Sequence, residues 1–128
     1  MSDGYVLDAS AILCLPFAEP GAAEVERSRP DAIVSAVNLA GVVSKLIERG
    51  TPDVLARRAT AASNPSVVPL DRETAEAAGL MRATTRHAGL SLGDRCCLAL
   101  AARTGRIAAT TDKARANVEI GVAIELLR

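Results

Sequence analysis

Short runs of apolar residues alternate along the chain with longer segments in which apolar residues recur every three to four positions. The short runs predict buried strands at Tyr5–Leu7, Ala32–Val34, Val67–Val68, Ile107–Thr110 and Val122–Leu126. The longer segments predict helices at Ser10–Phe17, Pro20–Ser28, Ala36–Arg49, Pro52–Ala62, Asp71–His87 and Ser91–Thr104, and a turn or short helix at Asp112–Ala116. Strands that alternate with helices indicate an α/β fold with a mainly parallel sheet of four to five strands. The length suits one domain over residues 1–128.

The charge balance limits how the chain can bind nucleic acid. Its 15 Lys and Arg residues match 15 Asp and Glu residues, so the net charge is zero, and no basic tail is present. The aromatic residues are Tyr5 and Phe17, too few for base stacking to be the main mode of RNA binding. Binding to RNA would therefore depend on a local basic patch or on metal ions.

The cysteines and the N-terminus indicate the cellular compartment. Cys14, Cys96 and Cys97 lie among apolar neighbours, and their odd number argues against a disulfide framework. With a single His in the chain, a Cys/His zinc site is not expected either, so these thiols should lie in the core. Residues 1–4 lack the features of a signal peptide, and no apolar stretch approaches the roughly 20 residues that span a bilayer. We expect a cytoplasmic protein with no membrane partner.

Three aspartates are the candidates for chemistry. Asp8 directly follows the first predicted strand, Asp112 follows the fourth, and Asp94 lies in the first turn of the helix that leads into the fourth. Ligands of open parallel sheets bind outside the carboxyl ends of the strands, so these side chains should meet at one edge. Carboxylates so close together repel one another unless a cation lies among them, and oxygen ligands favour Mg²⁺ or Mn²⁺.

Each aspartate also has a purely structural interpretation. Asp94 forms a Ser-x-x-Asp capping box with Ser91, and Asp112 is suited to cap a turn. Asp8 is harder to explain in this way, because an unpaired carboxylate at the end of a buried strand is costly. Three further aspartates follow no strand directly and are interpreted as turn or capping residues; they are Asp31, Asp53 and Asp71.

Four segments resemble, in the right order, the motifs of PIN-domain ribonucleases, of the kind found as toxins in VapC-type toxin–antitoxin pairs. They are Val6–Leu13 (VLDASAIL), Ser35–Leu46 (SAVNLAGVVSKL), Gly89–Ala101 (GLSLGDRCCLALA) and Ala109–Ala114 (ATTDKA). The resemblance covers nearly the whole chain. It implies a three-layer α/β/α fold, Mg²⁺- or Mn²⁺-dependent hydrolysis of RNA, a VapB-type antitoxin as partner, and a homodimer.

The resemblance assigns roles to individual residues. Asp8, Asp94 and Asp112 inherit the catalytic, metal-binding role, and Ser10 and Thr110 match hydroxyl positions near the metal. Basic residues flank the acidic ones and are candidate contacts for RNA phosphates; they are Arg95, Lys113 and Arg115.

Gly41 departs from the family pattern, which has Glu at this position. Inside a helix Gly costs about 1 kcal/mol relative to Ala, and Gly41 lies off the apolar stripe, so neither packing nor helix termination explains it. Two explanations are open: a naturally degenerate nuclease, or a substitution that silences a toxin. Either way, we expect an impaired enzyme with weak divalent ion binding.

Two other functions compete with the ribonuclease. One is a catalytically dead PIN-fold module that binds RNA or an antitoxin, which Gly41 favours. The other is a phosphoacceptor domain, which requires an acidic pair close to the end of the first strand and an aspartate at the end of the third, where Asp71 is better explained as a helix cap. A dinucleotide-binding function is not expected, because no GxGxxG motif follows a strand.

Overall fold

The computed structural model describes residues 4–63 and 65–128, and its strands form one parallel sheet. The strand order is β3-β2-β1-β4-β5, and every neighbouring pair is parallel. The strands are β1 (Tyr5–Leu7), β2 (Ile33–Ser35), β3 (Ser66–Val68), β4 (Ile107–Thr110) and β5 (Ile124–Leu126). Residues 1–3, part of the segment used to argue against a signal peptide, lie outside the described residues.

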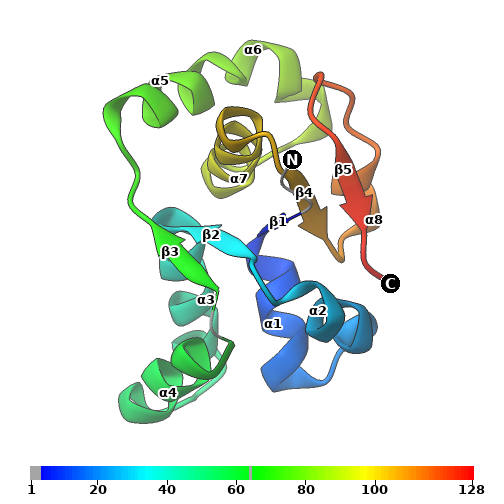
Figure 1. Ribbon diagram of the computed structural model, residues 1–128. Helices are drawn as coiled ribbons and strands as arrows, with labels where there is room; N and C mark the ends of the chain where they lie inside the picture. Colours follow the sequence, from blue (N-terminus) through cyan, green and yellow to red (C-terminus); the bar gives the residue numbers. More distant parts are fainter. Residues whose placement is uncertain (1–3, 64) are drawn as a thin grey trace.

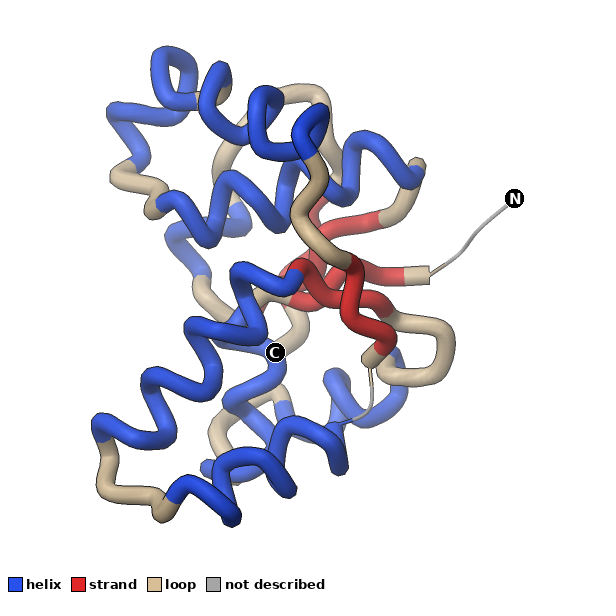
Figure 2. Tube along the Cα trace, turned by 90° about the vertical axis from the view of Figure 1, so that its left-hand side faces the viewer, coloured by secondary structure: helices blue, strands red, loops and turns tan. Residues whose placement is uncertain are grey.

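Helices cover both faces of this sheet (Figures 1 and 2). On one side lie α1 (Ala9–Phe17), α2 (Ala22–Ser28), α3 (Ala36–Glu48) and α4 (Asp53–Ser63), and on the other α5 (Arg72–Leu80), α6 (Arg82–Thr85), a 3₁₀ turn η1 (Arg86–Ala88) and α7 (Leu92–Thr104). The one-turn helix α8 (Lys113–Ala116) connects β4 to β5. The three-layer α/β/α fold expected from the sequence is thus the observed one.

The core alternates along the central strands because successive side chains of a strand point to opposite faces. Leu7 of β1 and Ala109 of β4 pack with the buried residues of α1 to α4. Val6 and Ala108, one position earlier in the same strands, pack against α7. Each face of the sheet therefore has its own hydrophobic layer.

Among residues 4–63 and 65–128, no helix has the length and apolar character needed to cross a bilayer.

The helix expected over Asp71–His87 is the main error of the sequence analysis. It divides into α5, α6 and η1. The hydroxyls of Thr84 and Thr85 both donate to the carbonyl of Met81, at 3.2 and 2.7 Å. The Thr85 N–H also donates to the same carbonyl, at 3.0 Å, so the hydroxyl bonds add to the helical bond and do not explain the division. The last strand is also shorter than expected, since it begins at Ile124 rather than Val122.

Asp71 caps α5, as expected, and also joins it to α7. Its carboxylate accepts from the backbone N–H of Thr74 at 2.8 Å and from Arg103 at 2.8 and 3.0 Å. The hydrogen bonds from Thr74, followed by the contact with Arg103, lower the pKa of Asp71 to about 2. A phosphoacceptor role is not supported, because Asp71 follows β3, which lies two strands away from β1 and Asp8.

We expect Asp71→Asn to lower the melting temperature by a few degrees at pH 7, and this effect to shrink as the pH falls from 3.8 through about 2. Asn still caps a helix but forms no ion pair with Arg103. Because the folded pKa is depressed, the contribution of Asp71 is fully present above its unfolded pKa of 3.8 and is lost as the pH falls through its folded pKa of about 2. Thermal unfolding of both proteins between pH 2 and 7 measures this; parallel curves at every pH would contradict it.

A candidate acidic site at the carboxyl ends of β1 and β4

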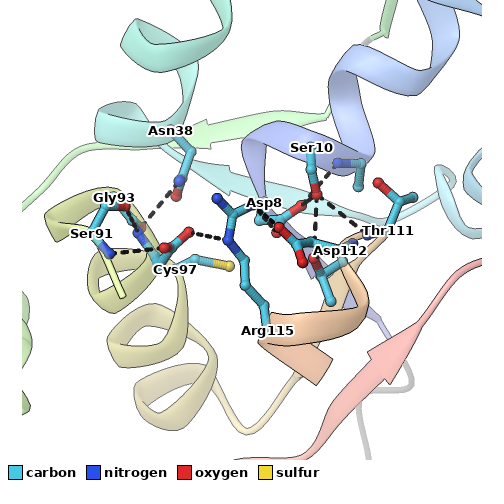
Figure 3. A network of polar contacts seen from close by, with 12 residues as sticks. Asp8, Ser10, Asn38, Ser91, Gly93, Cys97, Thr111, Asp112 and Arg115 are labelled. Carbon is cyan, nitrogen blue, oxygen red and sulfur yellow. Dashed lines mark hydrogen bonds and ion pairs between the residues drawn. The ribbon is translucent and has the colours of Figure 1, made fainter. Parts of the chain in front are cut away.

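The strand order reverses direction between β1 and β4, and three carboxylates lie outside the carboxyl ends of these strands. From β1 the chain continues to β2 on one side and later reaches β4 on the other, and ligands of open parallel sheets bind at such a reversal. A cavity lined by Asp8, Asp94 and Thr110, among others, lies there. Asp8 follows β1 and caps α1, Asp112 caps α8, and Asp94 is in the first turn of α7. All three form ion pairs with one guanidinium, that of Arg115 (Figure 3).

Asp8 is the most enclosed of the three carboxylates. Its side chain is 5 % exposed, and its Oδ1 accepts from the Ser10 hydroxyl at 2.7 Å and from the Ala11 N–H at 2.8 Å. Burial raises the pKa of Asp8, while hydrogen bonds from Thr110, Ser10 and Ala11 and the charge of Arg115 oppose the rise. Because the pKa of Asp8 stays raised despite these contacts, a further positive charge beside it would favour its ionised form.

Asp94 uses its two oxygens for different purposes. Oδ2 accepts from the Ser91 N–H at 2.9 Å, and the Ser91 hydroxyl accepts from the Asp94 N–H at 3.2 Å, which completes the expected capping box. Oδ1 lies 2.9 Å from Nε of Arg115. The structural interpretation of Asp94 is therefore correct without excluding a second role, since one oxygen remains directed at the site.

Two hydroxyls connect the ends of β1 and β4. Ser10 and Thr110 lie 3.2 Å apart, oxygen to oxygen. The Thr110 oxygen accepts from the Asp112 N–H at 3.0 Å, and Ser10 accepts from the Thr111 N–H at 3.3 Å. These contacts hold the loop after β4 against the start of α1, so Asp8 and Asp112 keep a fixed relation.

The three basic candidates have different environments. Lys113 is exposed on α8, as a phosphate contact requires. Arg95 is only 8 % exposed and donates from one terminal nitrogen to the Ala78 carbonyl of α5 at 3.1 Å, so the prediction that it contacts RNA is wrong. Arg115, expected to contact phosphates, instead lies among the carboxylates.

The donors at this site suit a hard divalent cation, since each of the three is a carboxylate oxygen. The cation that they surround is a guanidinium of the same chain. Within the described part of the chain, no three His, Cys, Asp or Glu side chains are close enough to form a ready coordination shell. A metal ion would therefore require Asp8, Asp94 and Asp112 to draw closer together.

Gly41 lies on α3 beside this site. It is exposed and lines a cleft of about 300 Å³ together with Ala9, Asn38, Asp94 and Arg115, among others. A Cβ added at Gly41 would meet only the Cβ of Ala9, at 4.0 Å. The position expected to carry Glu is thus at the acidic site, with free space for a side chain.

Sequence reasoning missed Asn38 and the place of Cys97 beside the acidic site. Asn38 is buried, donates from Nδ2 to the Gly93 carbonyl at 3.1 Å, and so joins α3 to the start of α7. Its place one helical turn before Gly41 was the available signal.

Cys97 lines a cavity with Asp8 and Asp94. Burial raises the pKa of its thiol well above the usual value, and the three cysteines are buried as expected.

Comparison with known proteins agrees with this geometry. The sequence model of the PIN domain matches residues 5–120. A search of curated proteins found no match. The fold is similar to VapC20 of Mycobacterium tuberculosis, a sarcin-ricin loop cleaving toxin, with 17% identity, 93% of this chain and 98% of that chain covered, and a TM-score of 0.74.

Two toxin–antitoxin structures are also similar. DNA-bound VapBC from Salmonella typhimurium matches with 16% identity, 99% of this chain and 100% of that chain covered, and a TM-score of 0.75. VapBC2 from Rickettsia felis, bound to a promoter fragment, matches with 12% identity, 97% and 98% coverage, and a TM-score of 0.75. At these identities the similarity concerns the fold.

Proposed function

This chain belongs to the PIN-domain family, and on that premise we propose that it is a divalent-metal-dependent endoribonuclease of the VapC toxin type, impaired by Gly41. The observation that carries the proposal is the convergence of Asp8, Asp94 and Asp112 on one positive group at the reversal of strand order. Ion pairs that only stabilise the fold would not need to bring three carboxylates, from three separate elements, around one cation.

The three aspartates would hold Mg²⁺ or Mn²⁺. When bound, such an ion polarises a phosphate oxygen and lowers the pKa of a coordinated water for in-line attack on the phosphodiester. Ser10, by donating to Oδ1 of Asp8, leaves Oδ2 of Asp8 directed at the centre of the site. The contacts of Thr110 with Ser10 and with the Asp112 N–H hold Asp8 and Asp112 in fixed positions relative to each other. A carboxylate on α3 at position 41 would orient the attacking water, and Gly41 supplies none.

A VapB-type antitoxin and a second copy of this chain are the proposed protein partners. Support comes from the similarity of the fold to the toxin–antitoxin structures of Salmonella typhimurium and Rickettsia felis. The helices around Ile12–Phe17 and Leu39–Ile47 are the proposed contact regions. Ile12 itself is buried in the core, whereas Ile47 is 43 % exposed and available to a partner.

A non-catalytic PIN-fold module that binds RNA or an antitoxin is the second candidate. Gly41 favours this module, because without Glu at position 41 the site has the arrangement of a nuclease but lacks one of the expected carboxylates.

Incubation of the protein, in excess, with a mixed RNA and either Mg²⁺ or Mn²⁺ tests the proposed function. We expect slow cleavage that EDTA stops and that excess metal restores. RNA that is bound but never cut, with the metal varied over a wide range, would favour the non-catalytic module instead.

A further inference from the structure

We propose that Arg115 is the resident counter-ion of the acidic site and that a divalent cation must displace its guanidinium to bind. This inference rests on the proposed function, since it concerns the regulation of the same site. It goes further by assigning to one residue of this chain the control of metal entry.

The geometry places the guanidinium where a shared cation would lie. Nε of Arg115 is 2.9 Å from Oδ1 of Asp94, and Nη1 of Arg115 is 3.6 Å from Oδ2 of Asp8 and 3.7 Å from Oδ2 of Asp112. The three carboxylates come from the end of β1, the start of α7 and the start of α8. Figure 3 shows the arginine side chain extending from α8 beside Asp8 and Asp112.

Electrostatics makes the guanidinium and a metal ion alternatives. The carboxylates repel one another, and the Asp8 and Asp94 side chains are 5 % and 10 % exposed, so solvent screens them poorly. A cation beside them favours their ionised forms, and Arg115 supplies part of that positive charge. A dication at the same centre would lie at contact distance from a like charge, which favours departure of the guanidinium.

The arginine can leave at little structural cost. Helix α8 is a single turn with no buried residue, and the Arg115 side chain is 33 % exposed. The start of α8 is held by the Asp112 carboxylate, which accepts from the Ala114 N–H at 2.9 Å. Metal entry that draws Asp112 inward would therefore loosen α8 and release Arg115 together.

Lys113→Gln provides a matched control for Arg115→Gln. Both variants remove one positive charge from α8, but Lys113 is exposed and, within the described residues, makes no ion pair with the three aspartates. A change in metal affinity that is confined to Arg115→Gln must therefore come from the contacts of the guanidinium and not from net charge.

The experiment is a Mn²⁺ titration of the unaltered chain, Arg115→Gln and Lys113→Gln, followed by calorimetry and by the electron paramagnetic resonance of free Mn²⁺. We expect Arg115→Gln to bind Mn²⁺ on the order of tenfold more tightly than the unaltered chain, and Lys113→Gln to differ by less than about twofold. Without metal, Arg115→Gln should melt at a lower temperature than the unaltered chain, and Mn²⁺ should reverse that difference because it binds only the folded state.

Hydrogen exchange of the unaltered chain gives a second readout that needs no variant. Saturating Mn²⁺ should speed the exchange of amides in residues 113–118 and should not affect α5. Unchanged or slower exchange in residues 113–118 would mean that α8 stays in place, and would overturn the inference even if Arg115→Gln failed to fold.

The outcomes distinguish this inference from the proposed function. Binding to the unaltered chain with equal or weaker affinity in Arg115→Gln overturns displacement and leaves the metal-dependent nuclease standing. Equal tightening in both variants assigns the effect to net charge and also overturns it. Absence of Mn²⁺ binding in all three proteins contradicts both the inference and the proposed function.

Discussion

We expect the Gly41→Glu protein to cleave a mixed RNA about 10² to 10⁴ times faster than the unaltered chain, the range that a group positioning an attacking water commonly contributes. Position 41 lies on α3 at a cleft that it shares with Asp94 and Arg115. The carboxylate would therefore enter the site from α3, a helix that contributes none of the three aspartates.

The substitution should not harm the fold. An added Cβ would make only an ordinary contact, with Ala9 at 4.0 Å. Glu is also a better helix former than Gly, so the free energy of unfolding should rise by up to about 1 kcal/mol. Measuring unfolding alongside cleavage would then show that a faster reaction does not come from the rescue of a misfolded protein.

Gly79→Glu is the matched control. Gly79 is a second helical glycine at which an added Cβ would meet nothing within 4 Å, but it lies on α5. Both variants add one negative charge and one better helix former, and thermal unfolding of both measures the stability that each gains. Only Gly41→Glu should gain activity; equal gains in both would attribute the effect to stability rather than to the acidic site.

The second large effect is expected from Asp8→Asn, introduced into the Gly41→Glu protein. Loss of a carboxylate that holds the metal should lower RNA cleavage on the order of a hundredfold or more. Asn can still accept from the Ala11 N–H, so the cap of α1 is kept. Asp53→Asn, at an exposed position in the first turn of α4, removes the same charge and should leave cleavage unchanged.

The same substitution should stabilise the fold at neutral pH. Burial raises the pKa of Asp8 above its unfolded value of 3.8. The folded state thus holds this proton more tightly, and stability is highest below the unfolded pKa and is lost as the pH rises through the folded pKa. Asp8→Asn has no charge to bury and avoids that loss. Thermal unfolding between pH 3 and 8 checks the sign; a lower melting temperature for Asp8→Asn at pH 7 would contradict it.

Much of the fold was predictable because local signals agreed with the tertiary structure. The capping box of Ser91 and Asp94 and the left-handed Gly105 mark the ends of α7 as expected. The helix expected after Asp71 is interrupted at Met81 and ends in the 3₁₀ turn η1. The apolar positions keep their helical spacing through this segment, so a count of apolar positions marks neither change.

The meeting of the three aspartates was also predictable, since the carboxyl ends of adjacent parallel strands share an edge. Their metal-binding role remains a proposal. The positions of the arginines were not predictable, because Arg95 and Arg115 both lie close to an acidic position in sequence and differ in the direction of their side chains. The helix phase of α7 directs Arg95 toward α5, whereas the turn of α8 directs Arg115 into the site.

The most direct test of the central claim is the initial rate of RNA cleavage by the unaltered chain, Gly41→Glu and Gly79→Glu, each with Mg²⁺ and with EDTA. We expect strong, EDTA-sensitive cleavage by Gly41→Glu and little by the other two proteins. Equal EDTA-sensitive rates in all three proteins, or no cleavage by Gly41→Glu with any RNA offered, would contradict it.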